Sequence, residues 1–382
     1  MIVQVAVPCP LYRTFDYHLE HDNSSPIGYR VRVPFGRRHV VGIIVSMTET
    51  SEYTQLKHAE LLDESACLTD DLLILGRWIS EYYHAPIGLV FKMMLPQKLR
   101  KNETHHRTHL VYLDVSENVE QWLADNPKKK VQSALVKELR THAPIERSKF
   151  CGLFNNFKAH EKALIEADIV LHVERYPESV SSRSTQFPLL PYQLNEEQQQ
   201  AINLVDLQKF SVSVLEGVTG SGKTAVYLEL VKKVLHTGRQ VLILVPEIGL
   251  TPQFIERVEQ ILQVDFVVIH SEVNETQKMS AWEAAKHHTT NLVIGTRSAL
   301  FTPFDNLGMI IIDEEHDGSY RQRDTVRYSA HDAAIQRAYL LGIPLILGSA
   351  TPILETLYNI ERERYQLLSL TERAKGSMPN WQ

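Results

Sequence analysis

The chain has 382 residues, of which 43% are hydrophobic and 23% charged, and its formal net charge is −6. This is an ordinary composition for a soluble globular protein of two or three domains, at ~100–200 residues each, and it excludes a uniformly basic nucleic-acid coat. Cys9, Cys67 and Cys151 form no C-x-x-C pair, so neither a disulfide framework nor a zinc site is expected. No signal peptide or membrane-length apolar run is present, which predicts a cytoplasmic protein with no membrane partner.

The first region, residues 1–104, is predicted to be a small β-barrel-like domain with an appended helix. Short alternating or apolar runs at 2–7, 30–33 and 40–45 are bounded by Pro, Gly and Asn, as is typical of strands joined by turns. Residues 70–83 carry an apolar stripe at helical spacing.

The second region, residues 105–175, is mainly helical in pattern. Residues 131–139 and 160–167 have apolar side chains at helical spacing, and 168–173 is a strand candidate. Helices followed by a short hairpin predict a winged-helix domain. The stretch 176–190, rich in Pro, Ser and Thr, predicts a linker.

The third region, residues 191–382, alternates between strand and helix candidates. The strand candidates are 212–215, 241–245, 266–269, 292–295, 309–312 and 344–347. This alternation predicts an α/β domain in which helices cover both faces of a parallel sheet. Ligands bind such sheets beyond the carboxyl ends of the strands.

One segment of this region, 217–224, fits the phosphate-binding P-loop at every position and lies between a strand and a helix candidate. Its glycines, which let backbone N–H groups converge on phosphates, are Gly217, Gly220 and Gly222. Lys223 is expected to reach the β- and γ-phosphates, and the Thr224 hydroxyl to ligate Mg²⁺. The segment therefore predicts that ATP and Mg²⁺ are the cofactors.

A second acidic segment, Asp313-Glu314-Glu315-His316, follows the apolar run 309–312. Its carboxylates are expected beside the P-loop of a neighbouring strand. Asp313 would then hold Mg²⁺ through water, and Glu314 would act as the general base for the attacking water. The alternative is an acidic helix N-terminus stabilised by the helix dipole.

Three shorter segments fit around this pair. The amide of Gln198 is able to read both edges of adenine, or to complete a capped helix start with Asn195, and both can hold together. Residues 348–352 follow a strand and offer hydroxyls that could relay ATP state to a bound polymer. Arg297, within 295–298, offers a cation to a phosphate backbone.

In this order, the P-loop, the acidic segment and Ser349-Ala350-Thr351 resemble the superfamily 2 helicases, which have RecA-like lobes. More narrowly, the chain resembles the primosomal protein N′ (PriA) family of replication-restart helicases along essentially its whole length. The segments that carry this resemblance are 14–17, 32–36, 244–253, 293–301 and 313–320.

The resemblance implies that the first region holds the 3′ end of a nascent strand at a stalled fork. The family's pocket for the terminal nucleotide maps onto Phe15, Asp16, Gly36 and Lys57. Phe15 offers a stacking face, Asp16 an acceptor for the 3′-hydroxyl or a base edge, and Gly36 a close backbone approach. Without the resemblance, the same residues are equally compatible with a basic sheet edge that faces solvent and binds nothing.

The resemblance also implies that residues 320–328 form an aromatic-rich loop, which couples single-strand binding to ATP hydrolysis through Tyr320, Arg327 and Tyr328. Two positions depart from the family. Val326 stands where an aromatic residue is usual, and His331 stands where the family has an arginine before the following Asp. Both changes remove a stacking or cationic group, so the strength of coupling is left open.

The function that the resemblance implies is an ATP-dependent 3′-to-5′ DNA helicase that recognises forked and single-stranded DNA. Single-strand-binding protein and other primosome proteins would be its partners, and it would help load the replicative helicase. The family continues with a second RecA-like lobe, its arginine finger and a zinc-binding insertion, and we expect none of these among the residues up to Gln382. A missing arginine finger typically costs ~10³–10⁵ in rate, so weak ATP binding and little unwinding are expected of the chain alone. The alternatives are a non-catalytic fork- or 3′-end-binding module with a vestigial ATP site, and a double-strand translocase.

Overall fold

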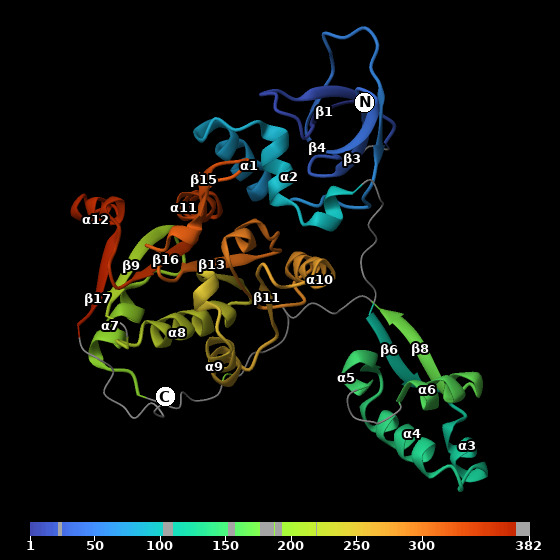
Figure 1. The fold of residues 1–382 in the computed structure, drawn as a ribbon. Coiled ribbons are helices and arrows are strands. Elements are labelled where there is room, and N and C mark those ends of the chain that lie inside the picture. Colours follow the sequence, from blue (N-terminus) through green and yellow to red (C-terminus); the bar gives the residue numbers. More distant parts are fainter. Residues whose placement is uncertain are drawn as a thin grey trace. The chain divides into compact units, whose positions relative to one another are not determined.

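The structure is a computed structural model, and it describes residues 1–21, 25–101, 110–151, 157–175, 187, 193–218 and 220–371. The chain divides into two compact units, Met1–His106 with Ser179–Gln382, and Arg107–Glu178. Each unit is described by itself (Figure 1). In the described part of the chain, none of the helices combines the length and the apolar character needed to span a bilayer.

Five short strands close into a small barrel at the start of the first unit. They are β1 (Ile2–Ala6), β2 (Phe15–Leu19), β3 (Arg30–Phe35), β4 (Arg38–Thr48) and β5 (His58–Leu61), in the order β1-β2-β5-β3-β4 around the barrel. Alternate side chains fill the interior, among them Val3, Val5, Val31 and Val33. The barrel predicted from the sequence is confirmed, with two strands, β2 and β5, that the apolar pattern does not predict.

Helices follow the barrel. They are α1 (Asp70–Tyr82), α2 (Ile87–Met94) and the short 3₁₀ helix η1 (Gln97–Arg100). The apolar stripe of α1 is buried, and it packs against α2 and against a helix of the third region, α11 (Ala330–Leu341). The helix expected over 70–83 is therefore present.

A seven-stranded sheet, in which all pairings are parallel, forms the centre of the first unit. Its strands are β9 (Ser211–Gly217), β10 (Gln240–Leu244), β11 (Phe266–Ile269), β12 (Leu292–Gly295), β13 (Leu307–Ile312), β16 (Pro344–Ser349) and β17 (Gln366–Leu370). Their order is β11-β12-β10-β13-β16-β9-β17. This confirms the RecA-like parallel sheet and all six predicted strands. The seventh, β17, lies at an edge with three of its five residues exposed, so its apolar signal is weak.

Helices cover both faces of this sheet, as the alternation of strands and helices predicts. One face packs against α7 (Glu196–Leu204), α8 (Lys223–Leu235) and α9 (Pro252–Leu262), and the other against α10 (Glu275–Lys286) and α11. Successive residues of β10 point to opposite faces, with Leu242 and Leu244 in one core and Val241 and Ile243 in the other. After β16 comes α12 (Leu354–Glu361).

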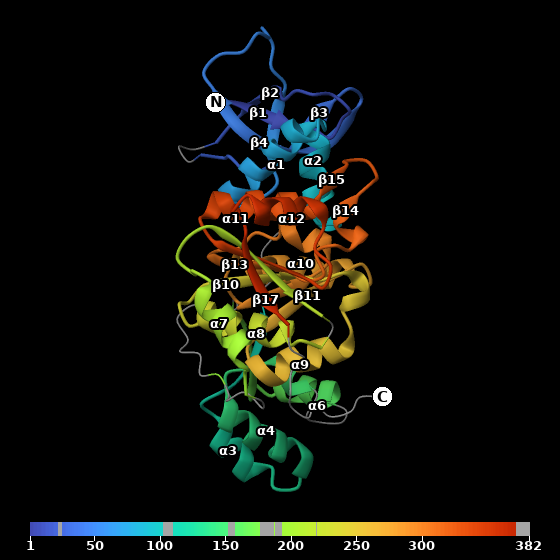
Figure 2. The same cartoon turned by 90° about the vertical axis from the view of Figure 1, so that its left-hand side faces the viewer.

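The core that contains α10 and α11 also contains α1 and α2. Leu72, Leu75 and Phe91 belong to the same buried cluster as Ala334 and Ala338 of α11. Figure 2 shows α11 between the sheet and the helices that follow the barrel. The barrel and the sheet are thus joined by one continuous apolar core.

The second unit is smaller. Its elements are β6 (Leu110–Val115), α3 (Val119–Asp125), α4 (Lys130–His142), β7 (Ile145–Glu146), α5 (Arg147–Cys151), α6 (Phe157–Glu166) and β8 (Val170–Arg175). The strands form an antiparallel sheet in the order β7-β6-β8, and the helices enclose a core that includes Leu113, Leu135 and Phe150. The winged-helix assignment of this unit stays a prediction.

A buried ion pair holds α11 to α1. The Nε of Arg337, a residue with no exposed surface, lies 2.8 Å from the Asp71 carboxylate. We expect Asp71→Asn to lower the free energy of unfolding by ~3 kcal/mol, because an arginine charge is left buried without its counter-charge. Asp70→Asn is the control, because Asp70 lies in the same first turn of α1 but is exposed. Both variants lose a negative charge that stabilises the helix dipole, so any further loss in Asp71→Asn comes from the ion pair. Equal effects of the two variants in urea denaturation would contradict the role of the pair.

Candidate active site

The P-loop has the strand-loop-helix geometry that its sequence predicts. β9 ends at Gly217 and α8 begins at Lys223. Gly220 and Gly222 have φ angles of 86° and 89°, which glycine adopts without strain. A Cβ at Gly217 would lie 2.4 Å from a side-chain oxygen of the loop, so this position also requires glycine. Thr219 lies outside the described residues.

The charged and polar groups around the loop fit a bound triphosphate. The Nζ of Lys223 donates to the Gly217 carbonyl at 2.9 Å and lies 3.3 Å from the Glu314 carboxylate. The buried hydroxyl of Ser221 has no hydrogen-bond partner among the described residues. Thr224 is half-buried in the first turn of α8, whose N-terminus adds partial positive charge. These residues would hold ATP, with Mg²⁺ on Thr224 and Asp313.

The acidic pair reaches this loop from further across the sheet than expected. Asp313 and Glu314 follow β13, and β16 lies between β13 and β9, so the two segments are not on neighbouring strands. The Tyr227 hydroxyl, on α8, donates to the Asp313 carboxylate at 3.0 Å. Burial and the charge of Glu314 raise the pKa of Asp313, opposed by Tyr227 and Lys223. Glu314 itself has a φ of 45°, a strained backbone that is typical of functional sites.

Gln198 packs directly against the P-loop. Its Nε2 donates to the Ser221 carbonyl at 3.0 Å, and its Oε1 accepts from the Asn195 N–H at 3.0 Å in a capping box. Both ends of the amide are therefore engaged, and the capped helix start is present. Recognition of adenine by Gln198 stays a prediction. It requires the Gln198 amide to share these two hydrogen bonds with the base or to break them.

Of the three residues assigned to DNA in the aromatic-rich loop, one is exposed and two are buried. Arg327 is exposed, whereas Tyr320 and Tyr328 are buried, and their rings are not open to a base in this structure. Tyr320 donates instead to the Asp313 carbonyl at 2.7 Å, and Arg297 donates to the Ser319 carbonyl at 2.8 Å. Burial favours a supporting role for the two tyrosines, while the DNA contacts of this loop stay predictions.

The two departures from the family pattern have a structural explanation. Val326 is buried in the core shared with α1, where it packs as an apolar residue. His331 lies between the carboxylates of Glu315 and Asp332, at 3.3 and 3.2 Å. Burial alone would lower the pKa of His331, but the bonds and charges of Asp332 and Glu315 raise it to about 9. A pKa raised to about 9 favours the cationic form of His331 at neutral pH, whereas the sequence predicts the loss of a cationic group at this position.

Three of the residues assigned to a 3′-end pocket, Phe15, Asp16 and Gly36, lie at the start of β2 and just after β3, whereas Lys57 precedes β5 and its carbonyl accepts from the His18 N–H at 2.9 Å. The rings of Phe15 and Phe35 meet edge to face with centroids 5.1 Å apart, and the Arg13 guanidinium lies 4.8 Å from the Phe15 ring centroid. Gly36, next to Phe35, has a φ of 59°, and a Cβ there would meet nothing within 4 Å. Sequence reasoning does not identify Arg13 or Phe35 because their contacts depend on the closure of the barrel. Lys57 is exposed.

The carboxylate of Asp16 is already occupied by the barrel. It accepts from Ser51 Oγ at 2.6 Å and from Gln4 Nε2 at 3.2 Å. These bonds fix its orientation, and its remaining lone pairs can accept from a ligand.

Among the residues that the structure describes, one group offers three ligand atoms to a metal ion. These atoms, on His18, Glu20 and His58, lie within 4.8 Å of one another. His18 and His58 are register partners on β2 and β5, with their Nδ1 atoms 3.4 Å apart. A single shared proton in an N–H···N hydrogen bond accounts for that separation. The expected lack of a zinc site stays a prediction.

Comparisons with known proteins agree with this geometry. Residues 4–96 match the PriA 3′ DNA-binding domain (3′BD) family, and residues 195–360 match the DEAD/DEAH box helicase family. Replication restart protein PriA of Haemophilus influenzae is 38% identical over 98% of the chain, and that of Bacillus subtilis is 30% identical over 94%. The chain is a relative of PriA. It carries a DEAD/DEAH box helicase domain, a class of ATPases that uses ATP and Mg²⁺.

The chain spans about half the length of the curated relatives it matches, 52% of the Haemophilus protein and 54% of the Bacillus protein. Among solved structures, RecG bound to a three-way DNA junction aligns with 50% of the chain and 25% of RecG, at 22% identity and a TM-score of 0.39. A DEAD box protein from Methanococcus jannaschii aligns with 49% of the chain and 56% of its own, at 18% identity and a TM-score of 0.31.

The charge on His331 predicts a pH-dependent stability. The pKa of about 9 lies above the ordinary value near 6.5, so the stabilisation is fully present below pH ~6.5 and is lost as pH rises through 9. We expect His331→Gln to lower the free energy of unfolding by on the order of 3 kcal/mol at pH 6, since the buried Glu315 carboxylate and the half-exposed Asp332 carboxylate lose their cation. The difference from the wild type should shrink towards pH 9.5 in denaturation curves. A difference that stays constant or grows over this range would contradict the assignment.

Proposed function

We propose that this PriA relative acts in an ATP-dependent 3′-to-5′ DNA helicase of replication restart. The observation that carries this proposal is the convergence of Lys223 and Glu314, which lie 3.3 Å apart although they come from separate segments of the sheet. A P-loop cation beside an acidic pair is the arrangement that phosphoryl transfer requires. The names of the matching family and relatives support DNA as the polymer on which it acts.

Each residue of the site has a separate role in the proposed hydrolysis of ATP. Lys223 exchanges its contacts with Gly217 and Glu314 for the β- and γ-phosphates, which frees the Glu314 carboxylate to orient and deprotonate the attacking water. Thr224 and Asp313 would hold Mg²⁺, whose charge would neutralise the triphosphate. Tyr227 keeps the Asp313 carboxylate facing α8.

We place DNA on two parts of the first unit. The barrel receives the 3′ end of a strand at a branched fork through Phe15, Asp16, Gly36 and Lys57, and the single strand runs past Arg297 and Arg327. The match of residues 4–96 to a 3′ DNA-binding domain supports the first of these contacts. By the same resemblance, single-strand-binding protein and other primosome proteins are its partners in the cytoplasm.

Replacement of the P-loop lysine tests the enzymatic role. We expect Lys223→Ala to reduce ATP turnover stimulated by forked DNA by ~10²–10³-fold, because a preorganised positive charge is lost from the transition state. Lys233→Ala is the control, since Lys233 lies on the same helix but is exposed. If the wild-type chain binds forks tightly yet neither binds nor hydrolyses ATP, the chain is a fork-binding module with a vestigial ATP site.

The barrel pocket is tested with substrates that differ only at the 3′ end. We expect Phe15→Leu to weaken binding to a fork with a 3′-hydroxyl at the branch by ~10-fold, as base stacking on an aromatic ring contributes ~1–3 kcal/mol. Binding to the same fork with a 3′-phosphate should be weak for both proteins. Equal affinity of the wild-type chain for the two forks, measured by fluorescence anisotropy, would exclude a 3′-end pocket.

A further inference from the structure

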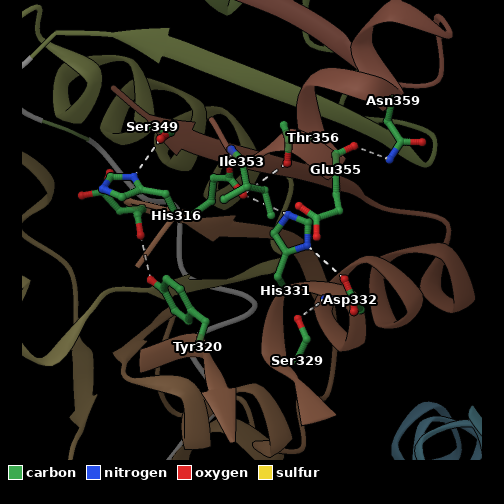
Figure 3. A network of polar contacts seen from close by, with 12 residues as sticks. His316, Tyr320, Ser329, His331, Asp332, Ser349, Ile353, Glu355, Thr356 and Asn359 are labelled. Atoms are coloured by element: carbon green, nitrogen blue, oxygen red, sulfur yellow. Dashed lines mark hydrogen bonds and ion pairs between the residues drawn. The ribbon is translucent and has the colours of Figure 1, made fainter. Parts of the chain in front are cut away.

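The third acidic residue of the 313–316 segment has no part in the hydrolysis described above. Glu315 is buried, and one of its carboxylate oxygens accepts from the Ile353 N–H at 2.9 Å and the other from the Thr356 hydroxyl at 3.2 Å. The second oxygen also forms an ion pair at 3.3 Å with His331, which lies beside Asp332 in Figure 3. Glu315 therefore ties the acidic segment to α12 and to the first turn of α11.

His331 extends this connection towards the first region. Its Nδ1 contacts Asp332 Oδ1 at 3.2 Å, and the other oxygen of Asp332 accepts from the Tyr83 hydroxyl at 2.8 Å. Tyr83 also accepts from the Ser329 N–H at 3.3 Å. Tyr83 is the C-cap residue of α1 and lies within the match to the 3′ DNA-binding domain. A continuous polar chain thus runs from that domain to the acidic segment.

The other end of the acidic segment is held to the strand beside the P-loop strand. His316 Nδ1 lies 2.8 Å from the Ser349 hydroxyl, at the end of β16, and 3.6 Å from the Glu314 carboxylate. Ser349 Oγ also accepts from the Thr351 N–H at 3.0 Å. A displacement of Glu315 is therefore transmitted to the backbone that carries Asp313 and Glu314, rather than absorbed by a loose loop.

We propose that Tyr83 and His331 are positioning residues that couple DNA-end binding by the barrel region to nucleotide binding at the ATP site. This inference rests on the proposed function. The contacts alternate between carboxylates and donors, and each is at least half-buried, so breaking one leaves a charge or a hydroxyl without its partner in a poorly solvated place. The α1–α11 contact and the acidic segment consequently shift together.

The same helix pair carries a second connection. Arg337, one further turn along α11, pairs with Asp71 of α1 and donates through its guanidinium to the Leu300 carbonyl at 2.5 Å. Leu300 follows the segment 295–298 that is assigned to the DNA backbone. With an ion pair near the start of α1 and Tyr83 at its end, α1 is held to α11 at two places, and the two helices move as one body.

The test compares two adjacent tyrosines. Tyr83→Phe removes only the hydroxyl that joins α1 to Asp332. Tyr82→Phe is the matched control, because Tyr82 lies on the same turn, is 61% exposed and stacks on Trp78 at 4.8 Å. Asp332→Asn and His331→Gln interrupt the same chain at its next two members. A cooperative thermal transition with a midpoint well above the assay temperature shows that each variant keeps its fold.

The measured quantity is the coupling between the two ligands in the full chain. The affinity for a non-hydrolysable ATP analogue with Mg²⁺ is determined with and without a saturating fork that has a 3′ end at the branch. Coupling free energies usually correspond to an affinity ratio of roughly 5–150-fold, and the reciprocal experiment must give the same ratio. We expect such a ratio for the wild type and Tyr82→Phe, and a ratio near one for Tyr83→Phe and His331→Gln, with the affinity for each single ligand unchanged.

Two outcomes overturn the coupling and leave the proposed function intact: a ratio of one in a wild-type chain that binds both ligands, or a wild-type ratio in Tyr83→Phe and Asp332→Asn. A wild-type chain that binds neither the ATP analogue nor the fork overturns the proposed function, and the coupling with it.

Discussion

The packing of α1 against α11 is the contact on which the rest of the first unit depends. It puts residues from the start of the chain and residues beyond position 330 into one apolar core, which also lines a face of the central sheet. Burial of apolar surface supplies most of the stability of such a contact, but it does not specify register. The buried Arg337–Asp71 pair and the Tyr83–Asp332 hydrogen bond specify the register of the two helices, because each has one arrangement in which its charge or hydroxyl is satisfied. The barrel and the sheet are therefore held in a defined relation that a smooth apolar interface alone would leave free to slide.

This arrangement gives hydroxyl groups a particular role around the acidic segment. Tyr227 and Tyr320 hold Asp313 by its side chain and by its carbonyl, from α8 and from the aromatic-rich loop respectively. Burial raises the pKa of both phenols well above the usual value, so they act as hydrogen-bond donors at any physiological pH. The aromatic-rich loop is thereby connected to the ATP site by a backbone contact at Asp313. A change in that loop on DNA binding has a direct path to the carboxylates, even though its two tyrosines are buried.

Much of this could be predicted from the sequence, and the failures have identifiable causes. The six predicted strands are mostly apolar runs, and Gly220 and Gly222 have φ angles that favour glycine, so the sequence near each of these positions predicts them. The exposed edge strand β17 lacks such a run. The position of β16 between β13 and β9 depends on topology, which the order of the motifs does not reveal. The raised pKa of His331 is set by two carboxylates, of which the fold brings Glu315 to it, so the sequence does not predict it. Tyr83 carries no local signal, since its partner Asp332 is 249 positions away.

The charges of the site favour the binding of a nucleotide together with a divalent cation. Lys223 contributes one positive charge, while Asp313 and Glu314 contribute up to two negative ones, so an ATP molecule meets net repulsion from the side chains. Burial and the negative charge of the neighbouring Glu314 raise the pKa of Asp313, because both disfavour a second negative charge at this place. A divalent cation held by Asp313 would add positive charge beside these carboxylates and so favour the approach of the phosphates. In the proposed mechanism, Lys223 would leave Glu314 on binding the phosphates, and the released carboxylate would act as the base.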